Sequence, residues 1–168
     1  MKKIIDAFDY AGDICKAMKK GILLTTKADG KVNTMTIGWG TMGIEWGRPI
    51  FVAYVRGSRH THEMIEKSGE FTVNTPFGEL DSKILGFCGT KSGRDTDKIQ
   101  ELGLTLVEPL NCGVPGIMEL PLTLECKVLY RMEQTLDTIP QDILDRYYPS
   151  GDFHYAYYAE IVGAYIAE

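Results

Sequence analysis

Arginines, hydroxyl side chains and a predicted helix start come together at positions 56–61. The segment follows an apolar run suited to a buried strand and precedes a helical pattern. Guanidinium groups and free backbone N–H groups at a helix N-terminus are donors that suit a phosphate monoester. The side chains concerned are Arg56, Ser58, Arg59 and Thr61. A capped surface helix with solvated arginines would show the same pattern, and the segment alone favours neither interpretation.

A second basic segment covers residues 91–98. Its cations are Lys91, Arg94 and Lys98. Ser92 and Asp95 have the spacing of a capping box, so we predict a helix start there. Such a start could meet a phosphate or the polar edge of a ring, although helix capping alone would also explain it. Asp95 and Asp97 are expected to serve the helix dipole and are assigned no acid–base role.

Polar side chains interrupt a β-prone run at residues 33–39, which ends in Trp39. A flavin needs hydrogen bonds along its pyrimidine edge and an apolar or aromatic wall for its ring. This segment could supply both. A strand with one solvated face is the alternative.

A glycine pattern that imitates a dinucleotide-binding loop occurs at Gly38, Gly40 and Gly43. Such a loop has to open a helix whose N-terminus faces a pyrophosphate. Residues 44–49 instead lead through another break into a strand. We therefore interpret these glycines as parts of a strand, bulge or tight loop.

The histidines and cysteines do not form a metal-site pattern. His60 and His62 lack partners at metal-ligand spacing, and His154 lies among tyrosines, which is typical of a core or interface histidine. The cysteines are Cys15, Cys88, Cys112 and Cys126. Their scatter favours reduced, packed thiols over a zinc site or a disulfide framework.

The elements that must position these residues are mostly strands. Alternating or continuous apolar runs predict strands at 22–27, 32–37, 50–55, 70–74, 122–131 and 154–166, and the first two form a hairpin. Helices are predicted at 9–20, 60–67, 80–88, 95–102 and 139–146. This pattern favours a mainly β fold, a β-barrel with short connecting helices. The last strand is apolar on both faces, so a subunit interface could cover one of them.

Composition limits the possible classes of protein. The chain has 168 residues, 44% of them hydrophobic and 24% charged, which fits one domain over residues 1–168. Its formal charge of −5 argues against nucleic acid or an anionic membrane as partner. Asp6 and Asp9 interrupt the first apolar run, and no later run is long enough to span a membrane. We expect a cytoplasmic protein.

Taken together, the segments resemble the flavin reductase-like family of FMN-binding split barrels, especially its flavoredoxin-like branch. The resemblance covers nearly the whole chain and depends on the order and spacing of its motifs. These are residues 33–39, the Arg-x-Ser-Arg-x-Thr pattern at 56–61, residues 88–98 and the terminal strand at 154–166. The resemblance implies a six-stranded FMN-binding split barrel of Greek-key type that forms a homodimer, with FMN near the subunit interface.

The resemblance also implies which residues bind FMN. Those lining the isoalloxazine ring would be Asn33, Thr34, Met35, Thr36 and Trp39. Those holding the phosphate would be Arg56, Ser58, Arg59 and Thr61. Those closing the other side of the site would be Cys88, Gly89, Ser92 and Lys98.

Proteins of this kind either reduce flavin with NADH or NADPH or carry electrons between partner proteins, and the shared motifs do not separate the two. We expect an oxidoreductase that passes electrons from NADH or NADPH, a transient substrate, through FMN to an unidentified acceptor. The hydride chemistry belongs to FMN, so no catalytic side chain is expected. The alternatives are a non-enzymatic FMN electron carrier, a split barrel that binds another aromatic ligand such as haem or pyridoxal phosphate, and one that has lost cofactor binding.

Overall fold

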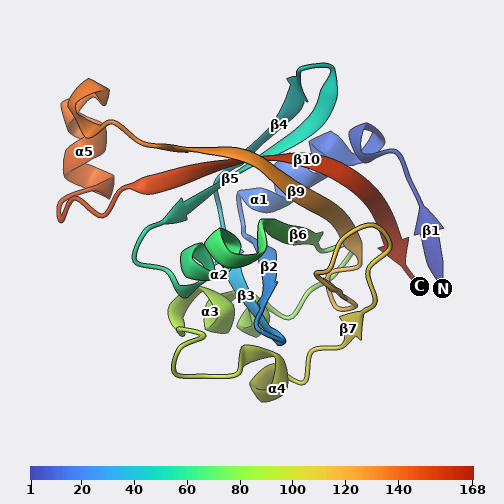
Figure 1. Cartoon of the computed structure of the whole chain (residues 1–168). Coiled ribbons are helices and arrows are strands. Elements are labelled where there is room, and N and C mark those ends of the chain that lie inside the picture. Colours follow the sequence, from blue (N-terminus) through green and yellow to red (C-terminus); the bar gives the residue numbers. More distant parts are fainter.

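The computed structural model describes residues 1–168 and contains one antiparallel sheet of eight strands, curled into an open barrel (Figure 1). The strands are β1 (Lys2–Ile4), β2 (Ile22–Ala28), β3 (Lys31–Ile37), β4 (Gly40–Glu45), β5 (Arg48–Arg56), β6 (Glu70–Thr75), β9 (Leu122–Glu133) and β10 (His154–Ala167). Their order in the sheet is β3-β2-β6-β9-β10-β5-β4, and β1 pairs with β10. A separate pair is formed by β7 (Leu106–Val107) and β8 (Gly116–Ile117).

The mainly β prediction is confirmed, and the predicted strands are β2, β3, β5, β6, β9 and β10. The sheet also contains β4 and β1, which the sequence analysis did not predict, so it exceeds the six strands that the resemblance implied. The glycines of β4 lower its β propensity. The first strand is short and charged, with Lys2 and Lys3, so neither segment gives a clear strand pattern.

The barrel core forms because alternate residues of the long strands point inward. Along β9, Leu122, Leu124 and Cys126 belong to the largest apolar cluster and are fully buried. Thr123 and Glu125, on the opposite face of this strand, are also buried. Residues 104–120 lie over that face, where the Glu125 carboxylate accepts hydrogen bonds from the backbone N–H groups of residues 110 and 111.

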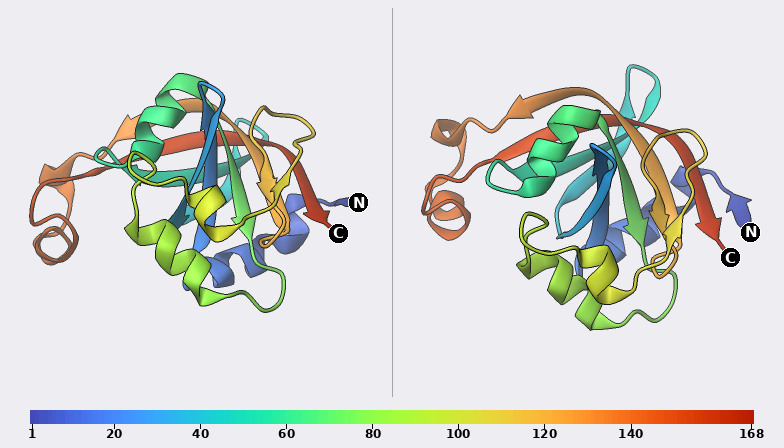
Figure 2. Two further views of the ribbon diagram at one scale, coloured as in Figure 1. Left: turned by 90° about the horizontal axis from the view of Figure 1, so that it is seen from below. Right: turned by 60° about the horizontal axis from the view of Figure 1, so that its bottom comes forward.

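The helices connect the strands and lie mostly outside the barrel. They are the 3-10 turn η1 (Ala7–Tyr10), α1 (Ala11–Met18), α2 (His60–Ser68), α3 (Ser82–Thr90), α4 (Lys98–Leu102), the 3-10 turn η2 (Leu136–Thr138) and α5 (Gln141–Tyr147). Figure 2 shows α3 and α4 together at one end of the molecule, beside the hairpin of β2 and β3. None of the helices combines the length and apolar content needed to cross a lipid bilayer.

One predicted helix start is wrong. The helix expected from residue 95 begins only at Lys98, because the Asp97 carboxylate caps it by accepting from the N–H of Gln100 at 3.0 Å. Ser92 does not cap this helix. Its hydroxyl accepts from the N–H of Arg94 at 3.2 Å and stabilises the preceding turn.

The sheet does not close into a complete barrel, because its two outermost strands, β3 and β4, do not pair. Gly38 and Trp39 connect them, and Gly40 and Gly43 lie within β4. No helix follows, so the rejection of a dinucleotide-binding loop is confirmed. Close packing explains the glycine at residue 40 instead, because a Cβ atom there would lie 2.9 Å from Cζ of Phe51 and 3.1 Å from the sulfur of Met18.

At the other end, β9 and β10 run past the barrel and carry η2 and α5 on a projecting arm, residues 134–153 (Figure 1). None of the residues in η2 or α5 is buried. The arm is attached at its base, where β5 and β10 pair from Glu160 to His154.

Candidate functional site

A basic hollow of about 190 Å³ lies where the start of α2 meets β3 and the turn before α4. We call it the basic hollow. Its lining consists of Asn33, Met35, Arg56, Ser58, Arg59, His60, Thr61, Lys91, Ser92, Gly93, Arg94, Lys98 and Asp152. Two sequence segments that are far apart, 56–61 and 91–98, therefore supply five cations to one small space.

Two of these cations are bound to backbone carbonyl groups alone. Arg56 donates to the carbonyl of Asp152 at 2.5 Å and to that of Tyr147 at 2.9 Å, so it joins the end of β5 to the arm. Lys98 donates to the carbonyls of Thr34 at 2.9 Å and Cys88 at 3.0 Å, and its side chain is buried. Burial lowers the pKa of Lys98. Both cations hold the walls of the basic hollow in place.

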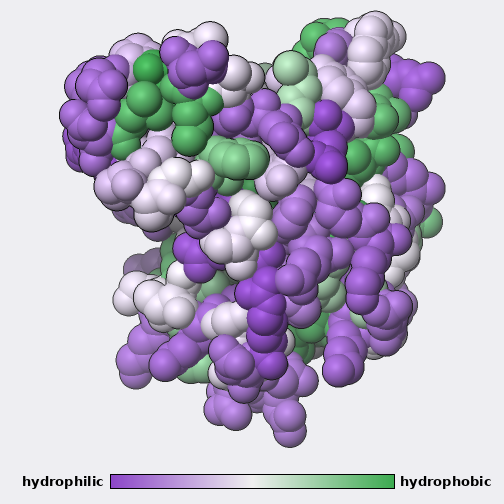
Figure 3. Space-filling view, turned by 60° about the vertical axis from the view of Figure 1, so that its left-hand side comes forward, coloured by the Kyte–Doolittle hydropathy of each residue, from purple (hydrophilic) through white to green (hydrophobic).

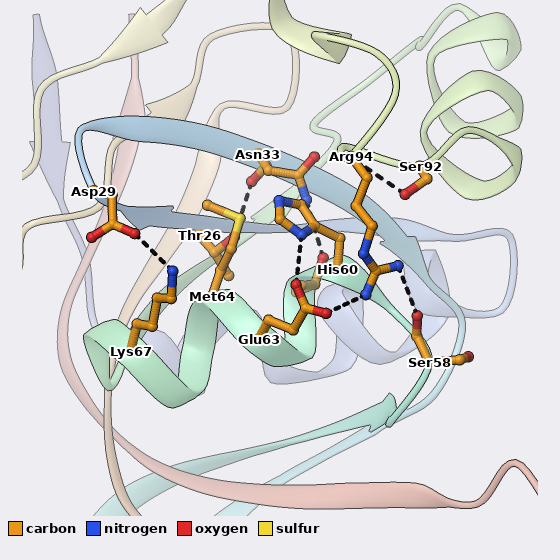
Figure 4. Close-up of polar contacts among 11 residues, drawn as sticks. Thr26, Asp29, Asn33, Ser58, His60, Glu63, Met64, Lys67, Ser92 and Arg94 are labelled. Atoms are coloured by element: carbon orange, nitrogen blue, oxygen red, sulfur yellow. Dashed lines mark hydrogen bonds and ion pairs between the residues drawn. The ribbon is translucent and has the colours of Figure 1, made fainter.

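A third cation, Arg94, crosses from the turn at 91–97 to α2 (Figure 4). It donates to the carbonyl of Ser58 at 3.1 Å and forms an ion pair with Glu63 at 2.5 Å. The same carboxylate lies 3.2 Å from Nδ1 of His60. Hydrogen bonds from Arg94 and His60 lower the pKa of Glu63. Gly93 permits this close approach, because a Cβ atom there would lie 2.3 Å from the amide oxygen of Asn33.

The remaining two cations, Arg59 and Lys91, are exposed and form no side-chain hydrogen bond or ion pair in the structure. An arginine and a lysine at the mouth of a hollow, beside a helix N-terminus, are suited to bind a phosphate. Arg59 also occupies the position just before α2 with an extended backbone. The walls of the basic hollow are thus held by hydrogen bonds, and two cations remain without a partner.

A second hollow, which we call the ring groove, continues from the basic hollow and has a volume of about 170 Å³. Met35, Arg56 and Arg59 line both. The other residues of the ring groove are Thr36, Ile37, Gly38, Trp39, Tyr54 and His154. The ring groove lies at the open side of the sheet, where the outer edge of β3 pairs with no further strand.

Aromatic packing fixes Trp39 at this groove. Its ring lies 5.1 Å from Tyr147 and 4.9 Å from His154, measured between centroids, and the side chain is still 41% exposed. The hydroxyl of Tyr148 lies 2.7 Å from Nδ1 of His154. Burial, with a smaller effect of Arg56, lowers the pKa of His154 to about 4. His154 is therefore a neutral, buried and hydrogen-bonded histidine, as predicted.

The structure brings most of the predicted site residues together. The basic hollow is lined by Asn33, Met35, Arg56, Ser58, Arg59, Thr61, Ser92 and Lys98, and the ring groove by Met35, Thr36, Trp39, Arg56 and Arg59. Gly89 is placed against Thr36, since a Cβ atom on it would lie 3.3 Å from Cβ of Thr36.

Two predicted side chains lie elsewhere. The Thr34 hydroxyl is buried on the face of the sheet opposite the barrel core, 3.0 Å from that of Thr25. The Cys88 thiol is buried in an apolar cluster, and burial raises its pKa to about 11. In both cases the backbone carbonyl, as an acceptor for Lys98, is the part that supports the site.

The predicted binding residues omit several that line the hollows. Lys91 and Arg94 carry charges that the sequence analysis noted without assigning them to the site. Tyr54 and Asp152 were missed entirely. Tyr54 could have been found from its place near the end of a predicted strand that leads to the Arg56 segment, whereas no local pattern marks Asp152.

Comparison with known proteins shows to which family this fold and its two hollows belong. Residues 17–168 match the family model described as "Flavin reductase like domain". The chain belongs to this family. The match covers the sheet from β2 onward, together with the basic hollow and the ring groove.

Similar proteins agree with this assignment. An uncharacterized protein of Archaeoglobus fulgidus is 37% identical over 103 residues, which are 61% of this chain and 57% of that protein. The chain matches between about half and three fifths of the length of its curated relatives. The crystal structure of flavoredoxin from Methanosarcina acetivorans is 28% identical, with a TM-score of 0.69 over 88% of this chain and 68% of that chain.

A further solved structure shows the shared fold over almost the whole length. It is an FMN-binding domain of a flavin reductase-like enzyme from Shewanella baltica, 20% identical, with a TM-score of 0.66. The similarity covers 99% of this chain and 77% of that chain. The resemblance to flavoredoxins and flavin reductase-like split barrels is thereby confirmed.

Proposed function

We propose that this chain binds FMN and passes electrons through it from NADH or NADPH to a flavin or protein acceptor. The observation that carries the proposal is the pair of unpartnered cations, Arg59 and Lys91, at a hollow that continues into a groove walled by Trp39. The family assignment and the FMN-binding name of the Shewanella baltica protein support it.

The residues present suit FMN in both chemistry and order. A phosphate monoester in the basic hollow would meet Arg59, Lys91 and the N-terminus of α2. A planar ring in the ring groove would meet Trp39 on one side and the free edge of β3, where backbone groups are available for hydrogen bonds. The two hollows share Met35, Arg56 and Arg59, so one ligand would span both.

The protein's part in this reaction is binding and orientation. When bound, FMN supplies the chemistry of accepting a hydride and releasing electrons. Trp39 and Tyr54 exclude water from the ring groove, while Arg56 and Lys98 keep the walls of the basic hollow at a fixed separation. His154 is neutral and already bonded to Tyr148, so we assign it to positioning Trp39 and not to proton transfer.

The test is an absorbance spectrum of the purified protein with FMN, followed by anaerobic addition of NADH or NADPH. We expect flavin absorbance that moves with the protein on gel filtration and that bleaches rapidly on reduction. A protein that ignores added FMN would contradict the proposed cofactor, and would favour a split barrel with another aromatic ligand or none.

A second candidate is a non-enzymatic FMN electron carrier. The similarity to flavoredoxin from Methanosarcina acetivorans favours it. In this case FMN would bind and the flavin bands would persist after NADH or NADPH is added. Stopped-flow measurement of the bleaching rate separates the carrier from the reductase.

We also propose that the chain forms a homodimer. The outer face of β5 and β10 carries a second apolar cluster of Ile50, Val52 and Ala156, flanked by Tyr54 and Tyr158. Figure 3 shows apolar side chains gathered over the nearby hairpin of β4 and β5 and over the arm. On the hairpin, Ile44 is 71% exposed and Trp46 64% exposed. Such patches mark interaction surfaces. Light scattering should give twice the mass of 18.8 kDa, and a monomer with bound FMN would contradict the proposal.

A further inference from the structure

A carboxylate occupies donors of the basic hollow. Oδ2 of Asp152 accepts a hydrogen bond from the Ser58 hydroxyl at 2.6 Å, and Oδ1 accepts one from the Ser58 backbone N–H at 3.4 Å. Asp152 lines the basic hollow together with Arg59 and Lys91 but forms no ion pair with either. The hollow that we assign to a phosphate therefore already contains an anion.

Strand register explains why Asp152 reaches this place. In the antiparallel pair of β5 and β10, His154 stands opposite Arg56. Continuing the register for two residues past the ladder puts residue 152 opposite residue 58. The continuation is held by the N–H of Gly57, which donates to the carbonyl of Phe153 at 3.3 Å, and by Arg56, which donates to the carbonyl of Asp152.

We propose that the Asp152 carboxylate is a built-in competitor for the phosphate of FMN. This rests on the proposed function and concerns the regulation of the same site. The phosphate and the carboxylate require the same Ser58 donors, and two anions in one small hollow repel each other. Bound FMN displaces Asp152 from Ser58, and Asp152 sets how tightly FMN is held and how readily it leaves.

The chain around Asp152 is suited to such a movement. Asp152 follows the exposed residues Ser150 and Gly151, and Gly151 has a φ of +73°, which glycine adopts without strain. The α5 helix just before this segment has no buried residue. Displacement of the carboxylate therefore breaks the two Ser58 contacts without disrupting a packed core. The conformation of the arm therefore depends on whether FMN occupies the basic hollow.

The matched pair of variants is Asp152→Asn and Asp137→Asn. The first keeps an amide oxygen that can accept from Ser58 but removes the charge from the basic hollow. The second makes the same change in net charge at an exposed position of the arm, in η2. Binding of FMN and of riboflavin, which lacks the phosphate, is measured by flavin fluorescence.

We expect Asp152→Asn to lower the Kd for FMN about tenfold relative to the wild type, the scale of removing one like charge a few ångströms away. The Kd for riboflavin should not change, and Asp137→Asn should match the wild type for both ligands. Equal FMN affinity in the wild type and Asp152→Asn would overturn this inference and leave the flavin site standing. Failure of both to bind FMN would overturn the flavin site, and this inference with it.

A double-mutant cycle tests the shared donor. If the phosphate takes over the hydroxyl of Ser58, then Ser58→Ala should weaken FMN binding more in the Asp152→Asn background, where the hydroxyl is easier to recruit, than in the wild type. Additive effects of the two substitutions on the Kd for FMN would contradict competition for Ser58.

Discussion

Residues 56–61 and residues 91–98 contribute the same kinds of side chain to one hollow, but they are held there in different ways. The first segment is tied to the projecting arm, through Arg56 and the carbonyls of Tyr147 and Asp152. The second is tied to the barrel, through the buried Lys98 and the carbonyls of Thr34 and Cys88. Each segment leaves one cation free, Arg59 in the first and Lys91 in the second. The difference teaches that the hydrogen-bond partners of a cation, and not its residue type, decide its role. A cation with partners supports the walls of the hollow, and one without partners is available to a ligand.

The largest expected effect concerns the buried anchor of the second segment. Lys98→Met should lower the free energy of unfolding by about 4 kcal/mol, since it leaves two carbonyls without a donor at roughly 1–3 kcal/mol each. Denaturant unfolding measures the change. Lys91→Met is the matched control and should stay within about 0.5 kcal/mol of the wild type. Similar losses for both variants would remove the distinction between anchor and free cation.

The stability of the protein should depend on pH through His154, which lies beside Arg56, the anchor of the first segment. Burial, with a smaller effect of Arg56, lowers the pKa of His154 from its ordinary value of 6.5 to about 4 in the folded protein. Between these pH values the unfolded chain binds a proton at this histidine that the folded chain does not, so stability falls as pH drops from about 6.5 towards 4. The loss is at most about 3 kcal/mol. Unfolding measured at pH 7 and pH 4.5 should show a smaller difference for His154→Gln than for the wild type, and identical pH dependence would refute this.

The free cation of the first segment should affect binding alone. Arg59→Ala removes a charge-assisted hydrogen bond to a phosphate, worth about 1.5–3 kcal/mol, so the Kd for FMN should rise roughly 10- to 150-fold. Thermal unfolding of the free protein should not change. Riboflavin is the control ligand, and its affinity should be the same in both proteins. Unchanged affinity for FMN would reject the phosphate assignment.

The smallest effect is expected at the ion pair that joins the second segment to α2. Glu63→Gln removes the ion pair with Arg94, which is exposed and therefore worth less than about 1 kcal/mol to stability. It should still raise the rate of FMN release modestly, because Arg94 joins the turn at 91–97 to α2. Stopped-flow release of FMN at low and high salt measures this, and the wild type and the variant should converge at high salt.

Local patterns in the sequence were sufficient for most of the fold. The Asp29-Gly30 pair between two β-prone runs indicates the hairpin of β2 and β3, and Gly21 and Gly69, which follow α1 and α2, indicate where these helices end. The start of α4 was misplaced because Ser92 and Asp97 both fit a cap, and only the three-dimensional path of the chain decides between them. The strand β4 was missed because its packing against α1 and Phe51 selects glycine at residue 40.

The site was predicted as far as local chemistry allows. The basic segment at 56–61 contains its own strand end and helix start, so its role as a hollow wall follows from adjacent residues. The burial of Lys98 does not, since it depends on carbonyls from β3 and α3. Asp152 is the clearest case of a residue that only strand register places in the site.

The contacts of β3 have a consequence for the behaviour of the whole protein. β3 is the last strand on one side of the sheet, and such a strand offers unpaired backbone groups to a strand of another chain. Lys98 donates to the Thr34 carbonyl, and the Thr36 hydroxyl donates to the carbonyl of Leu85 at 2.7 Å, so α3 and α4 are fastened along this side. These helices shield the part of the edge at Thr34 from intermolecular sheet growth, and the part that follows borders the ring groove. A substitution that frees α3 and α4 from β3 would therefore damage the ligand site and also promote aggregation.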